Sequence, residues 1–227
     1  MKTIILAGGK ATRLSQSAKD IPKALVKVGQ KPILQHQIDW LKSHGIKDKE
    51  IKLSLGFKAN EIIDYLAGKH DYVVEKEPLG TGGAIKFTSK GFKEPFLVLN
   101  GDILTDLNLS KFIDVFKESS FPNMHVISKV ANYEGLGVVM VDSGSTIKFL
   151  EKPDFENKKS SEFINVGVYI LSPNIFNGVD SEFFMIEKDI FPKISQEGML
   201  GNFVHNGFFQ DLGTEERLRK TRRTFNL

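Results

Sequence analysis

The sequence predicts a single α/β domain, a Rossmann-like three-layer sandwich in which helices cover a mostly parallel, mixed sheet. Apolar, β-branched strand patterns alternate with helical patterns through the first 123 residues. Alternation of this kind builds parallel sheets with helices on both faces. From Met124 onward, strands joined by glycine and polar turns predominate, so this half is expected to be richer in β structure.

The predicted elements of the first half follow a βαβ rhythm. Thr3–Ala7 form an apolar strand, and apolar residues at helical spacing predict a helix that starts near Ile33 and ends before Gly45. The remaining elements are a strand over 51–55, a helix over 61–66, a strand over 72–74, a helix over 82–89 and a strand over 96–99.

The second half is predicted to contain strands over 138–141, 147–150 and 166–171. A helix over 184–194, interrupted by Pro192, follows them, then a strand over 201–209 and a charged helix over 214–223. No repeat, low-complexity tract or linker indicates a second independent domain.

Composition, charge and hydropathy exclude several classes of protein. With 41% hydrophobic and 26% charged residues, the chain has the composition of a globular protein, and without cysteine it has no disulfides or thiolate metal sites. The net charge is only +3 and no long cationic stripe is present, so nucleic acid is not the expected partner. The apolar run at Ile4–Ala7 is too short for a signal peptide or a membrane span, which favours the cytoplasm and no membrane partner.

Glycines and cations follow the first predicted strand directly. Gly8 and Gly9 let the backbone turn sharply and approach a ligand, while Lys10, Arg13 and Lys23 bring positive charge to the same turn. Backbone N–H groups in such a loop bind anions, and an arginine can hold phosphate through two hydrogen bonds. The spacing fits neither the P-loop nor the dinucleotide fingerprint, which lacks its third glycine here.

This segment resembles the signature of the sugar-phosphate nucleotidylyltransferases. The resemblance rests on Leu6-Ala7-Gly8-Gly9-x-x-Thr12-Arg13-Leu14 and the following Pro22-Lys23. It departs from the family once, at Ala11, where a third glycine is usual and where a methyl group would stiffen the loop slightly. The resemblance implies that Leu6, Ala7, Gly8, Gly9 and Thr12 bind the nucleotide and that Arg13 and Lys23 are catalytic.

Two carboxylates are candidate metal ligands. Asp102 follows the buried strand over 96–99, at the edge where open α/β sheets bind ligands, and Asp211 lies between a predicted strand and a predicted helix. Mg²⁺ typically takes one or two carboxylates together with phosphate oxygens. Taken alone, each aspartate can be explained as a helix-capping or turn residue. Together with the N-terminal loop, the two aspartates resemble the family's metal pair.

A second glycine-rich segment, residues 75–84, follows the predicted strand over 72–74. The family uses this loop for the nucleobase, and its Glu-Pro-Leu-Gly-Thr-x-Gly form is similar to that of guanylyltransferases acting on mannose-type or heptose phosphates. Glycines here would let a flat base lie against the backbone. The resemblance assigns nucleotide binding to Glu77, Pro78, Gly80, Thr81 and Gly82.

Two segments of the second half, 149–153 and 165–169, resemble those that hold the sugar phosphate in the family. Lys152 would meet the phosphate, Glu151 and Asn165 would bind sugar hydroxyls, and Gly167 would allow close approach. Gly101, next to Asp102, is assigned to the same substrate. Residues 1–123 would then form the nucleotide-binding half and 124–227 the sugar-phosphate-binding half, without the C-terminal β-helix of some relatives.

The implied reaction is attack by a sugar 1-phosphate on the α-phosphorus of a nucleoside triphosphate, GTP being favoured, with Mg²⁺ as cofactor and pyrophosphate as the second product. D-glycero-D-manno-heptose 1-phosphate or a mannose-type phosphate is the expected acceptor. Three alternatives stay open: a uridylyl- or cytidylyltransferase, a non-catalytic regulatory subunit that binds a nucleotide sugar, and nucleic-acid binding through the basic residues near 217–223. A homodimer is also left open.

Overall fold

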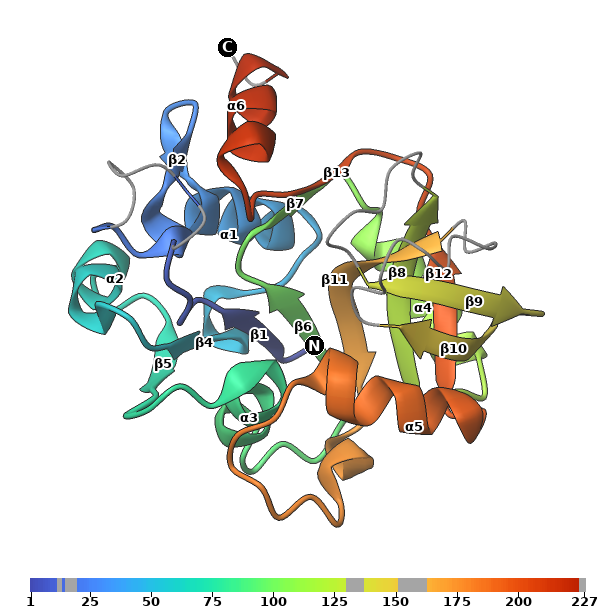
Figure 1. Ribbon diagram of the computed structural model, residues 1–227. Coiled ribbons are helices and arrows are strands. Elements are labelled where there is room, and N and C mark those ends of the chain that lie inside the picture. Colours follow the sequence, from blue (N-terminus) through green and yellow to red (C-terminus); the bar gives the residue numbers. More distant parts are fainter. Residues whose placement is uncertain (12–13, 15–19, 130–136, 151–162, 225–227) are drawn as a thin grey trace. The chain divides into compact units, whose positions relative to one another are not determined.

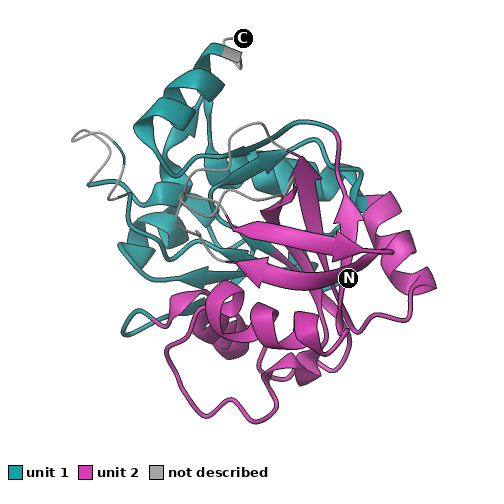
Figure 2. Ribbon diagram, turned by 45° about the vertical axis from the view of Figure 1, so that its right-hand side comes forward, with its two compact units in different colours: residues 1–78, 99–109, 207–227 teal, residues 79–98, 110–206 magenta. Residues whose placement is uncertain are grey.

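The computed structural model describes residues 1–11, 14, 20–129, 137–150 and 163–224. The chain divides into two compact units, which Figure 2 colours separately. Unit 1 comprises Met1–Pro78, Leu99–Leu109 and Gly207–Leu227, and unit 2 comprises Leu79–Val98 and Ser110–Asn206. Strand β6 (Phe96–Asn100) begins in unit 2 and ends in unit 1. The expected division into halves after residue 123 stays a prediction.

Unit 1 contains a parallel sheet with the order β5 (Asp71–Val74), β4 (Ile51–Leu55) and β1 (Thr3–Leu6). Helices α1 (Ile33–Ser43) and α2 (Ala59–Leu66) alternate with these strands along the chain (Figure 1). The side chains of β1 and β4 that carry the apolar pattern are buried. The predicted α/β class and the βαβ rhythm of the first half are therefore confirmed.

Short elements complete unit 1. A two-stranded ribbon pairs β2 (Lys27–Val28) with β3 (Lys31–Pro32), and a second ribbon pairs β7 (Ile103–Thr105) with β13 (Phe209–Asp211) in antiparallel fashion. The 3₁₀ turns η2 (Lys23–Leu25) and η3 (Asp48–Glu50) and helix α6 (Glu215–Thr224) are the remaining elements. The β7–β13 ribbon brings residues far apart in sequence into register.

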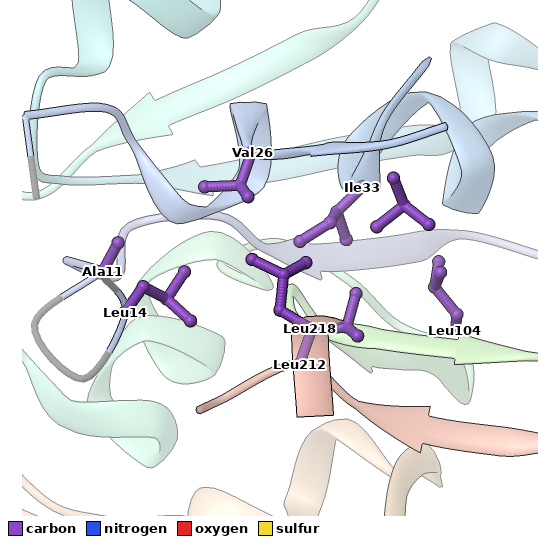
Figure 3. Packing of buried hydrophobic residues seen from close by; sticks show 8 residues of the cluster. Ala11, Leu14, Val26, Ile33, Leu104, Leu212 and Leu218 are labelled. Carbon is purple, nitrogen blue, oxygen red and sulfur yellow. The ribbon is translucent and has the colours of Figure 1, made fainter. Parts of the chain in front are cut away.

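A buried apolar cluster lies in unit 1 and joins three distant stretches of the chain (Figure 3). It includes residues near the N-terminal loop, residues around α1 and β7, and residues around α6: Ala11, Leu14, Val26, Val28, Ile33, Leu104, Leu212 and Leu218. Ala11 is only 1% exposed, so the methyl group by which this chain departs from the usual glycine is a core group.

Unit 2 contains a mixed sheet with the order β11 (Phe163–Leu171), β8 (Asn123–Lys129), β12 (Leu200–Val204), β10 (Ser145–Leu150) and β9 (Val138–Asp142). Strands β8 and β12 are parallel, and the other neighbours are antiparallel. Strand β9 also pairs with the first residues of β11, so the sheet curls back on itself. The β-rich character predicted from Met124 onward is confirmed.

The helices of unit 2 are α3 (Gly80–Thr88), α4 (Leu109–Glu118), whose first residue belongs to unit 1, and α5 (Phe191–Gln196), together with the turns η5 (Pro173–Phe176) and η6 (Ile186–Ile190). Helix α4 was absent from the predicted elements, although Leu109 and Phe112 are buried at helical spacing. Among the described residues, no helix is long and apolar enough to span a membrane.

Two predicted elements are wrong in their extent. The helix predicted over 184–194 is a turn of π-helix, η6, followed by α5, and Pro192 lies in the first turn of α5, where its missing N–H costs no hydrogen bond. The strand predicted over 201–209 is two strands, because β12 ends at Val204 and the chain passes from unit 2 to unit 1 after Asn206. Continuous apolar patterning does not reveal such a change of partner.

Candidate active site

The predicted site residues are distributed over both units. Unit 1 holds Leu6, Ala7, Gly8, Gly9, Lys23, Glu77, Pro78, Gly101, Asp102 and Asp211, and unit 2 holds Gly80, Thr81, Gly82, Asn165 and Gly167. Thr12, Arg13, Glu151 and Lys152 lie outside the described residues.

The glycine loop after β1 touches the end of the neighbouring strand. The carbonyl oxygen of Gly8 accepts a hydrogen bond from the backbone N–H of Phe57 at 3.1 Å. A Cβ on Gly8 would lie 3.1 Å from the nitrogen of Gly56 and 3.2 Å from Oε1 of Glu75, so a side chain there would force its neighbours to move. The packing of the loop thus favours glycine at position 8, independently of any ligand.

Lys23 and Asp102, which the sequence assigned to catalysis and to a metal, are in contact. The ammonium group of Lys23 donates a hydrogen bond to Oδ2 of Asp102, and both side chains are largely buried. The backbone N–H of Lys23 also donates to the carbonyl oxygen of Gly9 at 3.4 Å. Because an ammonium group has three donors, Lys23 can hold Asp102 and still donate to a phosphate oxygen.

The turn that carries Asp102 is fixed from two sides. A Cβ on Gly101 would lie 2.0 Å from the carbonyl oxygen of Leu6, so only glycine allows this approach of β1. From α1, the buried side chain of Gln37 donates through Nε2 to the carbonyl oxygens of Asn100 and Ile103, both at 2.9 Å. The carboxylate of Asp102 is therefore presented by a rigid turn.

Asp211 reaches the same turn through the β7–β13 ribbon. Its Cα pairs with that of Ile103, and the N–H of Leu212 donates to the carbonyl oxygen of Asp102 at 2.8 Å. The Asp211 carboxylate accepts a hydrogen bond from the N–H of Gly213 and lies 3.4 Å from the guanidinium of Arg217. Burial, together with the negative charge of Asp102, raises the pKa of Asp211 above its ordinary value.

The donor set of this pair fits Mg²⁺. Asp102 and Asp211 provide hard oxygen ligands whose mutual repulsion a divalent cation would relieve, and their side chains are 22% and 24% exposed. Within the described part of the chain, no cluster of three or more His, Cys, Asp or Glu side chains is arranged to hold a metal. Two carboxylates completed by phosphate oxygens are the kind of site that Mg²⁺ uses with nucleotides.

The glycines at the start of α3 pack against the chain itself. Gly80 has φ +71°, and a Cβ there would lie 2.5 Å from the carbonyl oxygen of Phe184. At Gly82 the ring of Phe184 would lie 2.3 Å from a Cβ, and the N–H of Gly82 donates to the carbonyl oxygen of Phe184 at 2.9 Å. An approaching base was the expected reason for these glycines, whereas in the structure the 182–186 segment is their close neighbour.

Asn165 and Gly167 lie at an irregularity of β11. The register between β11 and β8 shifts between Asn165 and Tyr169, and Gly167 has φ +85°, which favours glycine. The N–H of Gly167 donates to Oδ1 of Asn165 at 3.3 Å, and Nδ2 of Asn165 donates to the hydroxyl of Tyr169 at 2.8 Å. The amide of Asn165 is thereby held in one orientation.

Three residues of this arrangement were not among the predicted site residues: Gln37, Glu75 and Glu187. Gln37 fixes the Asp102 turn, Glu75 faces Gly8 and accepts a hydrogen bond from Ser54 Oγ at 2.9 Å, and Glu187 binds Thr81 and Tyr169 in unit 2. The position of Glu75 after β5 is a signal that could have identified it. Gln37 and Glu187 could not be identified in this way, because their partners are distant in sequence.

The sequence model of the nucleotidyl transferase family matches residues 2–225. The chain belongs to this family. Among curated relatives of this nucleotidyl transferase family member, the D-glycero-alpha-D-manno-heptose 1-phosphate guanylyltransferase of Campylobacter jejuni is 36% identical over 225 residues, covering 95% of this chain and 96% of the relative. The mannose-1-phosphate guanyltransferase of Aspergillus oryzae is 33% identical over 227 residues, covering 94% of this chain. This chain spans 61% of that relative's length.

Solved structures agree with the family assignment. HddC from Yersinia pseudotuberculosis has a TM-score of 0.84 and 33% identity, covering 99% of both chains, and a second structure of that protein is a complex with GMP-PN. A UDP-glucose pyrophosphorylase complexed with UDP-glucose has a TM-score of 0.83 at 22% identity, which shows a shared fold alone. The neighbours confirm the predicted α/β fold of a nucleotidyl transferase.

Proposed function

We propose that this nucleotidyl transferase family member is a Mg²⁺-dependent sugar-1-phosphate guanylyltransferase that acts on a heptose or mannose-type 1-phosphate. The observation that carries the proposal is the cluster of Lys23, Asp102 and Asp211 in unit 1, which contacts the glycine loop through the Lys23 N–H. The choice of guanylyl transfer draws on the Campylobacter relative, which aligns over nearly its whole length, and on the GMP-PN complex of HddC.

The proposed reaction needs no side-chain base. A sugar 1-phosphate is largely a dianion at neutral pH, because its second pKa is about 6. One of its oxygens forms a bond to the α-phosphorus of GTP, the bond between the α-phosphorus and the bridging oxygen to the β-phosphate breaks, and pyrophosphate leaves with that electron pair. The protein's task is to align two anions that repel each other and to stabilise the departing charge.

The residues divide this task between them. Lys23, held by Asp102, donates to the α-phosphate, and the loop N–H groups after β1 face the triphosphate. Asp102 and Asp211 would hold Mg²⁺, which supplies charge neutralisation at phosphate oxygens. Arg13 and Lys152, which lie outside the described residues, are proposed to stabilise the leaving pyrophosphate and to bind the sugar phosphate. Glu151, Asn165 and Gly167 are proposed to position the sugar.

Pyrophosphate release tests the proposal directly. GTP, UTP, CTP, ATP and dTTP are each combined with a panel of hexose and heptose 1-phosphates, with and without Mg²⁺. We expect a signal that requires Mg²⁺ and that is selective for GTP and for a heptose or mannose-type phosphate. Selectivity for UTP or CTP would keep the mechanism and overturn the guanylyl assignment. Nucleotide-sugar binding without any pyrophosphate release would favour a regulatory subunit.

A further inference from the structure

A hydrogen-bond chain in unit 2 runs from the start of α3 to β11 through Glu187. Oε2 of Glu187 accepts from the hydroxyl of Thr81 at 2.5 Å, and Oε1 accepts from the hydroxyl of Tyr169 at 3.1 Å. Tyr169 in turn accepts from Nδ2 of Asn165 at 2.8 Å. These hydrogen bonds thus connect Thr81, which is assigned to the nucleotide, with Asn165, which is assigned to the sugar.

Burying these hydrogen-bonded groups costs free energy, because they lose their contacts with water. Tyr169 is fully buried and Glu187 is 6% exposed, and a buried carboxylate must be hydrogen-bonded to offset its lost hydration. Its two oxygens are used by two different hydroxyls, each on a different element. One hydroxyl belongs to Thr81, which is assigned to the nucleotide, and the other to Tyr169, which contacts Asn165.

A carboxylate at this position fixes the direction of every hydrogen bond in the chain. Because it only accepts, the hydroxyls of Thr81 and Tyr169 must both donate to it. The oxygen of Tyr169 is then free to accept from Asn165, which turns the amide oxygen of Asn165 toward the N–H of Gly167. The oxygen of Thr81 accepts from the N–H of Ile186 at 3.0 Å, which anchors the first turn of α3.

We propose that Glu187 is a positioning residue that sets the first turn of α3 for the nucleotide and the Asn165 amide for the sugar phosphate at the same time. The inference rests on the proposed function, since it takes Thr81 and Asn165 as substrate neighbours. Glu187 itself touches no substrate; it acts through the two hydroxyls. Replacing it with glutamine would leave one acceptor oxygen and introduce an NH2 group that can face either hydroxyl, so the two hydroxyls could no longer both donate to it and both branches would be weakened.

Steady-state kinetics on three variants test this role. Glu187→Gln is expected to raise the KM of both substrates by about tenfold, because the hydrogen bonds that hold the two segments lose their charged acceptor. Tyr169→Phe breaks only the branch to Asn165 and is expected to raise the KM of the sugar phosphate while that of GTP stays within about twofold. Asp189→Asn is the matched control: it removes a carboxylate from the same turn, where Asp189 is exposed and accepts from the N–H of Met185 at 2.7 Å.

Two results would overturn the proposal. One is a Glu187→Gln enzyme with both KM values as close to wild type as those of Asp189→Asn. Another is a Tyr169→Phe enzyme with equal increases in both KM values, which would indicate general loosening of unit 2. If Glu187→Gln does not fold, Tyr169→Phe decides alone, since its split between the two substrates supports the branch to Asn165 and no split refutes it.

Amide hydrogen exchange without substrate separates this inference from the proposed function. In Glu187→Gln we expect faster exchange both in residues 79–84 and in residues 163–168, because the anchors of both segments are weakened. In Tyr169→Phe only the second segment should exchange faster. Unchanged protection in both segments of Glu187→Gln would refute the coupling even if the enzyme is active, and the expected pattern would support it even if no tested substrate pair reacts.

Discussion

Lys23 bonds Asp102 through its side chain and Gly9 through its backbone N–H, so one residue links the glycine loop to the aspartate turn. The two side chains are 13% and 22% exposed, a setting in which an ion pair is screened less than at the surface. A lysine placed in this way balances the paired aspartates before any cation or nucleotide arrives. The pair is therefore the first target for mutation.

Asp102→Asn should lower turnover by on the order of 10²-fold or more while the protein stays folded, because the amide binds a metal and Lys23 more weakly. Initial rates over a series of Mg²⁺ concentrations, with circular dichroism as a check on folding, measure this effect. Asp106→Asn, at an exposed position just after β7, is the control and should keep the wild-type rate. Arg13→Ala is expected to lower turnover to a similar extent. Near-normal turnover in both Asp102→Asn and Arg13→Ala would refute the site assignment.

Gly101→Ala should destabilise the protein strongly, because its Cβ would lie 2.0 Å from the carbonyl oxygen of Leu6 and backbone would have to move. Gly9→Ala is the matched substitution in the loop, where a Cβ meets nothing within 4 Å. In urea unfolding, we expect the free energy of unfolding of Gly9→Ala to lie within about 0.5 kcal/mol of the wild-type value. That of Gly101→Ala should be lower than the wild-type value by more than about 2 kcal/mol. Equal stability of the two variants would contradict the close approach of β1 to this turn.

Ala11→Gly should reduce stability by about 1 kcal/mol, since it deletes a buried methyl group and adds backbone freedom to the unfolded chain. Its affinity for the triphosphate should stay within about twofold of wild type, because the methyl group packs into the apolar cluster. Urea unfolding and a nucleotide titration measure the two effects. Tighter nucleotide binding with unchanged stability would show instead that the methyl group strains the loop.

Acidification should weaken the fold through His125. Burial lowers the pKa of this histidine from 6.5 to about 4, although a hydrogen bond with Asn165 opposes the shift. The unfolded chain therefore binds a proton at His125 more readily than the folded protein does. The free energy of unfolding should be highest above about pH 6.5 and should fall by about 3 kcal/mol as the pH drops to about 4. Urea unfolding of wild type and His125→Gln across this range measures it. If the free energy of unfolding of His125→Gln depends on pH as steeply as that of wild type, other groups cause the pH dependence.

The region around the glycine loop and the Asp102 turn could be predicted because β1 and β6 are almost continuous apolar runs, followed within two residues by Gly8 and by Gly101 and Asp102 respectively. The β1 strand, the glycine loop and the turn at Asp102 all follow from such local order. Gly101 shows the limit of this reasoning, since it was assigned to a substrate, whereas the structure shows that the neighbouring backbone of Leu6 already requires glycine. The ligand contacts of all the predicted site residues remain predictions.

Long-range partners could not be predicted. Glu187 lies in a segment that was predicted as one helix, and its two hydroxyl partners are far away in sequence. Gln37 sits between apolar residues on the buried face of α1, where its sequence position gives no sign of the two carbonyl oxygens that it binds. Polar residues of this kind acquire their roles only when the fold brings their acceptors and donors to them.

The apolar cluster of unit 1 also has a consequence for how the protein is made. Leu212 and Leu218 help bury Ala11 and Leu14, so the core beside the N-terminal loop stays incomplete until almost the whole of this sequence has left the ribosome. Arg222 then ties α6 to the carbonyl oxygen of Lys27 with two hydrogen bonds at 3.0 and 2.9 Å. All residues of unit 2 precede Gly207, so they are synthesised before Leu212 and Leu218. The loop that contains Ala11 is thus made before unit 2 but is among the last segments to reach its final form.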